Sequence, residues 1–373
     1  MFGYKLFSAY FALYLVDQGL EFAQVGYSYF FIYIAFVVVA PFIGVLEHKV
    51  NPALLAGVGI FGYATYSLGM LTVPPGVVFY LLQIMLGVSA AFFFVASRTM
   101  LIHSHPVHHD ASFGWFYSAA IYAEFIAPIV GGIILLFFGF PGIFIASIVI
   151  YILDIIFSTS KTREIKQPES VPQINKGSIE NYAAIFSQLK GTKILPLLFF
   201  SFTVIVVNGF YGPFLILFLK DIGLARSEIV AYISIFSAAL IPLSFFVIKF
   251  LKKATRYEGI VASGLIHSFS SFVFGIFGAK INIGALLGVN TFKSLGGFIT
   301  NSKRSGTISK DFPQYSVEAG VIDSVFSPFG VAIGALIGGF IVSNFGFQAL
   351  FIIGGTAVLI SSVITSLLIR KEK

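Results

Sequence analysis

The chain has no cysteine, a single tryptophan and few charged residues: Asp, Glu, Lys and Arg make up only 10% of its 373 residues. Without cysteine it can form neither a disulfide nor a thiolate metal site. A soluble domain carries about 25% charged residues, so this composition cannot cover a water-exposed surface. Apolar residues make up 57% of the chain, 17% of it is aromatic, and the mean hydropathy is +0.95. The composition therefore predicts an integral membrane protein.

Long apolar runs alternate with short polar or Gly/Pro-rich breaks along the whole chain. At about 20 residues per crossing, twelve helices would use roughly 240 residues, which leaves no room for a separate soluble domain. The sequence therefore predicts an all-α integral membrane protein with twelve transmembrane helices. These helices are expected at residues 1–16, 23–46, 52–73, 75–98, 113–137, 140–158, 194–219, 227–250, 258–278, 283–301, 316–342 and 345–369.

A polar stretch at 159–193 divides the predicted helices into six and six. It predicts a cytoplasmic linker between two six-helix bundles, 1–158 and 194–373. If both termini face the cytoplasm, 19 of the 23 Lys and Arg residues lie inside and three lie outside. Because basic loops resist translocation, this bias predicts a multi-pass protein of the cell (plasma or inner) membrane with cytoplasmic termini. The net charge of +7 then reflects topology, and no nucleic-acid partner is expected.

The two predicted bundles contain similar segments at a nearly constant spacing, as an internal repeat requires. The offsets are 204, 201 and 207 residues, and the pairs are 14–20 with 218–224, 85–88 with 286–289, and 127–132 with 334–339. The bundles are therefore expected to be parallel, pseudo-symmetric repeats. In this alignment the counterpart of the seventh helix would begin about ten residues before Met1, so the first helix looks short; a cleavable signal peptide is the alternative explanation.

Two short motifs carry a family resemblance. After the second predicted helix lies a glycine-acid-basic loop, Gly44-Val45-Leu46-Glu47-His48-Lys49. The fifth predicted helix contains a small-residue motif formed by Ala123, Ala127, Pro128, Gly131 and Gly132. With twelve helices in two parallel halves, these motifs make the whole chain similar to the major facilitator superfamily, and its fifth helix resembles that of the drug exporters.

The resemblance implies a secondary transporter that moves a small solute by alternating access to a midplane site. It also implies conformational roles for six residues of the two motifs: Gly44, Glu47, Lys49, Pro128, Gly131 and Gly132. Close packing of small residues between helices is the alternative reading of the helix-five motif. The sequence departs from the exporter pattern at His48, where an aspartate is usual, and at Gln83, where the exporters place an arginine.

Two ionisable residues are expected near the middle of the membrane. At 1.5 Å per residue, Glu124 lies about 16 Å along the fifth helix and Lys293 about 15 Å along the tenth. A charge at that depth costs about 2.5 kcal/mol or more if it is unpaired. Since the resemblance places both helices at the central cavity, the two charges could meet across a substrate site, with Glu124 carrying a proton and Asn290 assisting Lys293. The alternatives are a static ion pair and two residues that never meet.

Several other polar residues lie at useful depths in the predicted helices. Those that could donate hydrogen bonds to a substrate, or equally bond between helices, are Gln83, Asn208, Tyr211 and Tyr10. Asp323 could line the inner half of the pathway, or cap a helix or pair with a loop cation. Asp154 and His267 are interpreted as structural residues.

Four histidines are close together between the fourth and fifth predicted helices: His103, His105, His108 and His109. Histidine-rich tracts can bind metal ions, but this spacing is not that of a closed zinc site. A solvated loop is the main interpretation, and metal-ion transport or sensing is an alternative function.

The predicted function is proton-coupled export of a small amphipathic organic solute, since 45 phenylalanines favour an aromatic-walled cavity. Proton-coupled uptake of a nutrient (an amino acid, organic acid or sugar) is the alternative, with Lys293 and Asn290 holding a carboxylate. An enzyme is not expected, because no nucleophile with a base and orienting acid and no phosphate-binding loop is recognisable. The expected partners are the small-molecule substrate, the proton and membrane lipid; no cofactor is expected, and the protein is expected to be a monomer.

Overall fold

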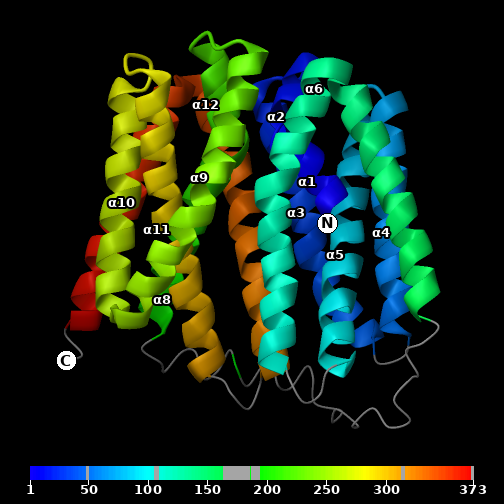
Figure 1. The fold of residues 1–373 in the computed structure, drawn as a ribbon. Coiled ribbons are helices and arrows are strands. Elements are labelled where there is room, and N and C mark those ends of the chain that lie inside the picture. Colours follow the sequence, from blue (N-terminus) through cyan, green and yellow to red (C-terminus); the bar gives the residue numbers. More distant parts are fainter. Residues whose placement is uncertain (48–49, 105–108, 163–184, 186–193, 312–315, 371–373) are drawn as a thin grey trace. The chain divides into compact units, whose positions relative to one another are not determined.

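The computed structural model describes residues 1–47, 50–104, 109–162, 185, 194–311 and 316–370, and these form helices and no strand (Figure 1). The helices are α1 (Phe2–Ser8), α2 (Phe11–Asp17), α3 (Phe22–Leu46), α4 (Pro52–Thr72), α5 (Val77–Ser104), α6 (His109–Thr162), α8 (Leu195–Asp221), α9 (Arg226–Lys253), α10 (Arg256–Phe277), α11 (Ile283–Asp311) and α12 (Ser316–Arg370). Eight segments of the described residues are long and apolar enough to cross a membrane. The predicted all-helical membrane fold is confirmed at this level, while the count of twelve crossings stays a prediction.

The contacts divide the chain into two compact units. The first unit comprises Met1–Leu20 and Phe31–Lys176, and the second comprises Glu21–Phe30 and Gly177–Lys373. In the first unit α4 packs on α5 and α6, and α1 packs on α6; in the second, α12 packs on α8 and α10, and α11 packs on α9 and α10. The predicted linker lies mostly outside the described residues, apart from the end of α6 and Ile185.

The same backbone turns recur in both units at the offsets of the sequence repeat. Gly19 after α2 and Gly223 after α8 both have positive φ, 85° and 94°. In each case the next residue donates its N–H to a carbonyl five residues back, from Leu20 to Leu15 at 3.1 Å and from Leu224 to Leu219 at 3.1 Å. This is a helix C-cap that favours glycine, and it recurs 204 residues later.

A second pair of turns divides the two longest helices. α6 contains Gly139 at φ 66° and ψ −168°, and α12 contains Gly346 at φ 78° and ψ 175°. Only glycine adopts such angles readily. Gly139 lies in the predicted break at 138–139, whereas Gly346 is the second residue of the helix predicted at 345–369. The turn predicted after residue 137 is therefore confirmed, while the turn predicted at 343–344 lies two residues further along the chain, at an offset of 207 from Gly139.

The prediction of one helix at 1–16 is wrong, because the helix breaks between Ser8 and Phe11. Tyr10 has φ −108° and ψ 1°, although the break contains neither proline nor glycine. A tertiary contact accounts for it: the Tyr10 hydroxyl donates to the carbonyl of Pro128 in α6 at 2.8 Å. The neighbouring backbones also approach closely, since a Cβ at Gly131 would collide with the Leu6 carbonyl oxygen.

Two predicted helix ends are also wrong. α5 continues to Ser104 instead of 98, and α11 continues to Asp311 instead of 301. Both extensions carry polar residues, which hydropathy assigns to loops. Lys303 and Arg304, counted as loop cations, therefore belong to α11.

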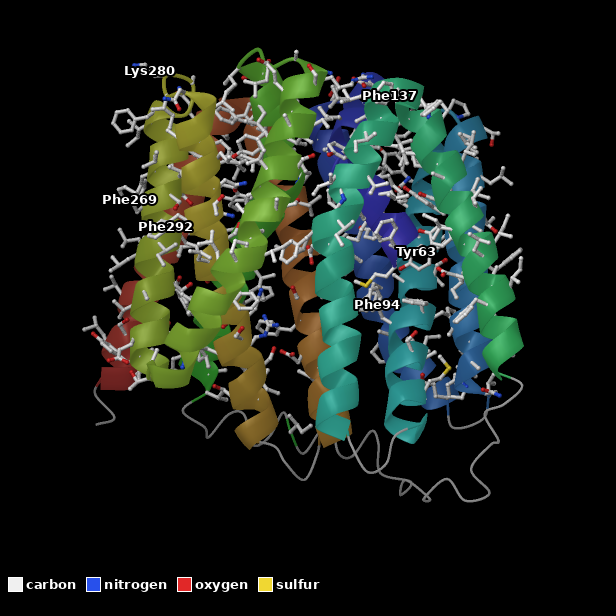
Figure 2. All side chains as sticks on the ribbon, viewed as in Figure 1. Tyr63, Phe94, Phe137, Phe269, Lys280 and Phe292 are labelled. Carbon is white, nitrogen blue, oxygen red and sulfur yellow. The ribbon has the colours of Figure 1, made fainter. Side chains whose placement is uncertain are left out.

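The surface is apolar, as expected for helices in a lipid environment. Phe42, Phe61, Phe137 and Phe269 are 61 to 78% exposed, and Figure 2 shows Phe269 pointing outward from the second unit. Tyr63 of the first unit is by contrast buried among helices. Polar side chains such as Gln83 and His267 are completely buried. The interior of each unit is therefore the place to look for a site.

The close approach of α1 to α6 gives a first prediction. Gly131→Ala should lower the stability of the folded protein by about 1–3 kcal/mol, because its methyl group would displace the backbone of α1. Thermal unfolding in detergent, followed by the loss of the monodisperse elution peak, measures the effect. Gly57→Ala in α4 is the matched control, since nothing lies within 4 Å of its added Cβ. Equal melting temperatures for the two variants would contradict the packing described here.

Candidate functional site

A group of buried polar side chains lies inside the second unit, where α8, α10 and α11 meet. We call it the Lys293 cluster, and its members are Lys293, Asn208, Tyr211, His267 and Ser271. Lys293 Nζ donates to Asn208 Oδ1 at 3.0 Å and lies 3.5 Å from the centre of the Tyr211 ring. His267 Nε2 lies 3.4 Å from the same Asn208 oxygen. The Tyr211 hydroxyl donates to Ser271 Oγ at 2.7 Å.

The cluster contains a buried positive charge with neutral neighbours. Lys293 is 5% exposed, Tyr211 is 4% exposed and His267 is completely buried. Ion pairs join Lys5 with Glu124 and Arg304 with Asp323, whereas the described partners of the Lys293 ammonium are an amide oxygen and a tyrosine ring. An amide oxygen and a ring face compensate only part of the cost of burying an ammonium group. The site is therefore suited to receiving a negative charge.

Two adjacent glycines of α11 make room for this arrangement. A Cβ at Gly296 would come within 2.5 Å of His267 Nδ1, and one at Gly297 would lie 3.4 Å from Asn208 Nδ2. The imidazole and the amide thus pack against bare backbone. Ser263 of α10 fixes the helices further by donating to the Gly296 carbonyl at 2.8 Å.

The structure brings together three of the predicted site residues, Lys293, Asn208 and Tyr211. Asn290 is buried one turn before Lys293, but its side chain hydrogen-bonds with Tyr232 of α9. Tyr232 in turn donates to the Leu286 carbonyl at 3.2 Å. Asn290 therefore connects α9 with α11 in the described contacts.

Two other predicted substrate ligands form bonds between helices of the first unit. The amide oxygen of Gln83 accepts from the Tyr66 hydroxyl at 3.1 Å, and its nitrogen donates to the Phe79 carbonyl. Tyr10 donates to the Pro128 carbonyl at the break between α1 and α2. Both side chains are buried with these partners, which matches the packing alternative.

Glu124 has a partner that the sequence prediction did not name. Lys5 Nζ of α1 donates to Glu124 Oε1 of α6 at 3.2 Å. The Lys5 side chain is 21% exposed, whereas the Glu124 side chain is 62% exposed. Tyr33 lies close enough to interact electrostatically with both charges and hydrogen-bonds with Tyr4. The predicted meeting of Glu124 with Lys293 stays a prediction, because the two residues belong to different units.

Asp323 forms an ion pair between α11 and α12, as in the alternative that paired it with a cation. Arg304 Nε donates to Asp323 Oδ1 at 2.9 Å, and Ser305 Oγ donates to Oδ2 at 2.7 Å. The same guanidinium group donates to Asn301 and lies over the Phe326 ring. The partner is a residue of α11 and not a loop cation.

The structure describes five of the six residues of the two family motifs for which conformational roles are predicted. Pro128, Gly131 and Gly132 lie buried in α6, in keeping with packing against α1. Gly44 faces open space, and Glu47 follows α3, but Lys49 lies outside the described residues. Their conformational roles stay predictions.

The histidine tract also stays untested. His105 and His108 lie outside the described residues, and so do the side chains of His103 and His109. Among the described side chains no group of three or more His, Asp or Glu residues is placed to hold a metal ion.

Sequence reasoning missed His267, Ser271, Lys5 and Arg304 as members of these polar groups. A signal for the first two was present: Ser263, His267 and Ser271 are four residues apart, so they lie on one face of an otherwise apolar helix. A polar stripe of this kind in a membrane helix indicates an interior face. Arg304 was obscured because the helix end was set too early.

The Arg304–Asp323 pair gives a second prediction. Asp323→Asn should lower the free energy of unfolding by about 3 kcal/mol, because it leaves a guanidinium group that is 5% exposed without its counter-charge. The double variant Arg304→Met/Asp323→Leu should recover most of that loss, since it removes both charges. Thermal unfolding in detergent distinguishes the two. A double variant that is less stable than the single one would show that the pair itself is strongly stabilising.

Comparisons with known proteins extend the argument from the site to the whole chain. Residues 1–321 match the Major Facilitator Superfamily. Among solved structures, the chain is similar to a mutant of the nucleoside transporter NupG, with a TM-score of 0.79 and 13% sequence identity over 98% of this chain and 97% of that one. A comparison with curated protein sequences gave no match. At this identity the structural likeness establishes the fold, and the sequence match over most of the chain establishes the family. The chain is therefore a multi-pass membrane transporter of small molecules that belongs to the major facilitator superfamily.

Proposed function

We propose that this protein is a secondary active transporter of a small amphipathic organic solute that carries an anionic group. The observation that supports the proposal is the buried Lys293 ammonium, whose described partners are a neutral amide and a tyrosine ring. A carboxylate on the solute would supply the missing negative charge through a charge-assisted hydrogen bond, which is stronger than a neutral one.

The surroundings of Lys293 favour a solute with an apolar body. Tyr211 presents its ring to the ammonium group and packs against Phe274 and Phe351 at centroid distances of 5.9 and 5.0 Å. A polyhydroxylated solute would need many more hydrogen-bond partners than this aromatic wall offers. The proposed ligand is therefore a small organic acid with an aromatic or aliphatic group.

The proposed transport cycle follows from the family fold. We propose twelve crossings, with α1 and α2 forming one and with Gly139 and Gly346 each dividing a long helix into two. The six-helix bundles 1–158 and 194–373, joined by a cytoplasmic linker, would rock about a midplane site by alternating access. We place both termini on the cytoplasmic side of the cell membrane and expect a monomer in lipid.

Glu124 supports the proposal of proton coupling. Its carboxylate is largely exposed although it lies in an apolar helix, and it has a cationic partner in Lys5. A carboxylate in this setting can take up and release a proton while Lys5 holds it in place. With the exporter-like fifth helix, we propose export of the solute in exchange for protons.

Uptake is the second candidate, and the Lys293 cluster itself favours it. An anion and the proton on Lys293 neutralise each other, so they could cross together in the same direction. The direction is measured in proteoliposomes with an imposed proton gradient. Accumulation driven by an inward gradient indicates uptake, and extrusion driven by it indicates exchange.

The role of Lys293 gives a third prediction. Wild-type proteoliposomes should exchange aromatic or aliphatic monocarboxylates such as benzoate, but not the corresponding neutral amides. Lys293→Met should raise the apparent KM for the carboxylate at least tenfold, because one charge-assisted hydrogen bond contributes about 1.5–3 kcal/mol. Lys280→Met is the matched control, since Lys280 is exposed in the turn after α10 (Figure 2). Equal transport of acids and amides, or a normal KM in Lys293→Met, would refute the anion site.

The role of Glu124 gives a fourth prediction. Glu124→Gln should abolish accumulation driven by a proton gradient and leave downhill exchange intact, because an amide cannot carry the proton. Asp221→Asn, exposed at the end of α8, provides the control. Unchanged gradient-driven accumulation in Glu124→Gln would remove this residue from the coupling mechanism.

A further inference from the structure

His267 makes contacts that a single fixed hydrogen arrangement does not satisfy. Its Nε2 lies 3.4 Å from Asn208 Oδ1, and its Nδ1 lies 3.3 Å from the carbonyl oxygen of Ser263. Both neighbouring oxygens are acceptors, but a neutral imidazole has only one N–H group. A doubly protonated imidazole would place two cations around Asn208, with no acid among the described side chains of the cluster. At any moment, therefore, a neutral His267 donates a hydrogen bond in only one of the two contacts.

The heavy-atom positions of the cluster accommodate two hydrogen arrangements, which differ in the orientation of the Asn208 amide. In the first, Lys293 is charged, and Asn208 Oδ1 accepts from both Nζ and the Nε2–H group of His267. In the second, the amide is turned over, so that its NH2 group donates to His267 Nε2 and to the lone pair of a neutral Lys293. His267 then carries its proton on Nδ1 and donates it to Ser263.

The amide can turn over because its oxygen can accept two hydrogen bonds and its NH2 group can donate two. Gly297, which faces the other end of the amide, has no side chain to select one orientation. The first arrangement matches the Asn208 oxygen as it lies in the structure. The second satisfies the Ser263 contact that the first leaves without a donor.

We propose that Asn208 and His267 are positioning residues that couple the charge state of Lys293 to the tautomer of His267. The proposal rests on the proposed role of Lys293 as the anion site. An anion beside Lys293 favours the charged ammonium and hence the Nε2–H tautomer. Departure of the anion allows Lys293 to lose its proton, and the amide and imidazole then stabilise the neutral amine. Binding of the anion is thereby linked to uptake of a proton within one unit of the protein.

Few other groups in the described structure compete for this role. Tyr211 of α8 places its ring against Lys293 and donates its hydroxyl proton to Ser271. Tyr232 of α9 is engaged with Asn290 and Leu286. Asp323, an acid of α12, is held by Arg304 and Ser305. The coupling therefore runs through Asn208 between Lys293 and His267.

The test is the nitrogen NMR spectrum of the full-length protein in detergent, labelled with 15N at histidine. Its chemical shifts distinguish the Nε2–H and Nδ1–H tautomers, and His267→Gln identifies the signal of His267. In the wild type, His267 should convert from Nε2–H to Nδ1–H as the pH rises from about 5 to about 10. Lys293→Arg, which stays charged, should keep Nε2–H at every pH, and Lys293→Met should keep Nδ1–H. Lys280→Met should convert as the wild type does.

Two results would overturn the proposal. One is a wild-type protein that keeps a single tautomer over the whole pH range. The other is the same tautomer in Lys293→Arg and Lys293→Met. The wild-type titration needs no substitution, so a variant that fails to fold does not decide the outcome.

Adding benzoate or benzamide to the labelled protein distinguishes this inference from the proposed function. At high pH, benzoate should return His267 to the Nε2–H tautomer, and the neutral benzamide should not. If the tautomer of His267 differs between Lys293→Arg and Lys293→Met but does not change when benzoate is added, the coupling is supported and the anion site is refuted. If the tautomer of His267 is the same in both Lys293 variants, the coupling is refuted, whether or not benzoate is transported.

Discussion

An ammonium group held inside an apolar helix bundle is the constraint on which the second unit depends. Lys293 is nearly inaccessible, and its neighbours offer oxygen, a ring face and an imidazole but no acid among the described residues. Stability alone would favour a methionine at such a position, because burying an unpaired charge is costly. The proposed function accounts for the charge, because the transported anion would supply its counter-ion. The glycine pair of α11 and the polar stripe of α10 both serve to hold the partners of this one group.

The first unit also contains a cation within a helix bundle, but there the cation forms an ion pair. There the cation, Lys5, has an acidic partner, and that partner is the more exposed of the two. Protonation of the carboxylate would remove this ion pair, whereas binding of an anion would give Lys293 an ion pair. The two proposed proton sites thus differ: the carboxylate of Glu124 has a cationic partner in the protein, whereas the ammonium group of Lys293 would receive its counter-ion from the solute.

Much of the fold could be predicted from the sequence, because hydropathy and glycine placement are local signals. The turn at Gly139 lies in a predicted break between apolar runs, and the turn at Gly346 lies two residues after one. The break at Tyr10 could not be found in this way, since it depends on the carbonyl of Pro128, which lies 118 residues away in the chain. In the candidate site, too, local features were predictable and tertiary contacts were not. The depths of Lys293, Asn208 and Tyr211 could be counted from the predicted helix starts. The partners of Lys293 and Glu124 depend on how the helices are rotated against each other. His267 was interpreted as a structural residue, and its contacts with Asn208 and Ser263 could not be named because a lone histidine gives no indication of what faces it.

The recurring glycine turns bear on how this transporter arose. Two copies of an ancestral six-helix segment would keep the backbone turns that each copy needs in order to fold. The paired turns at Gly19 and Gly223 and at Gly139 and Gly346 are of this kind. The charged residues have not been kept in pairs: at the repeat offsets, Lys293 corresponds to Phe92 and Glu124 to Val331. A duplication would account for the paired glycine turns, and divergence of the copies would account for charges that lack a counterpart at the repeat offset.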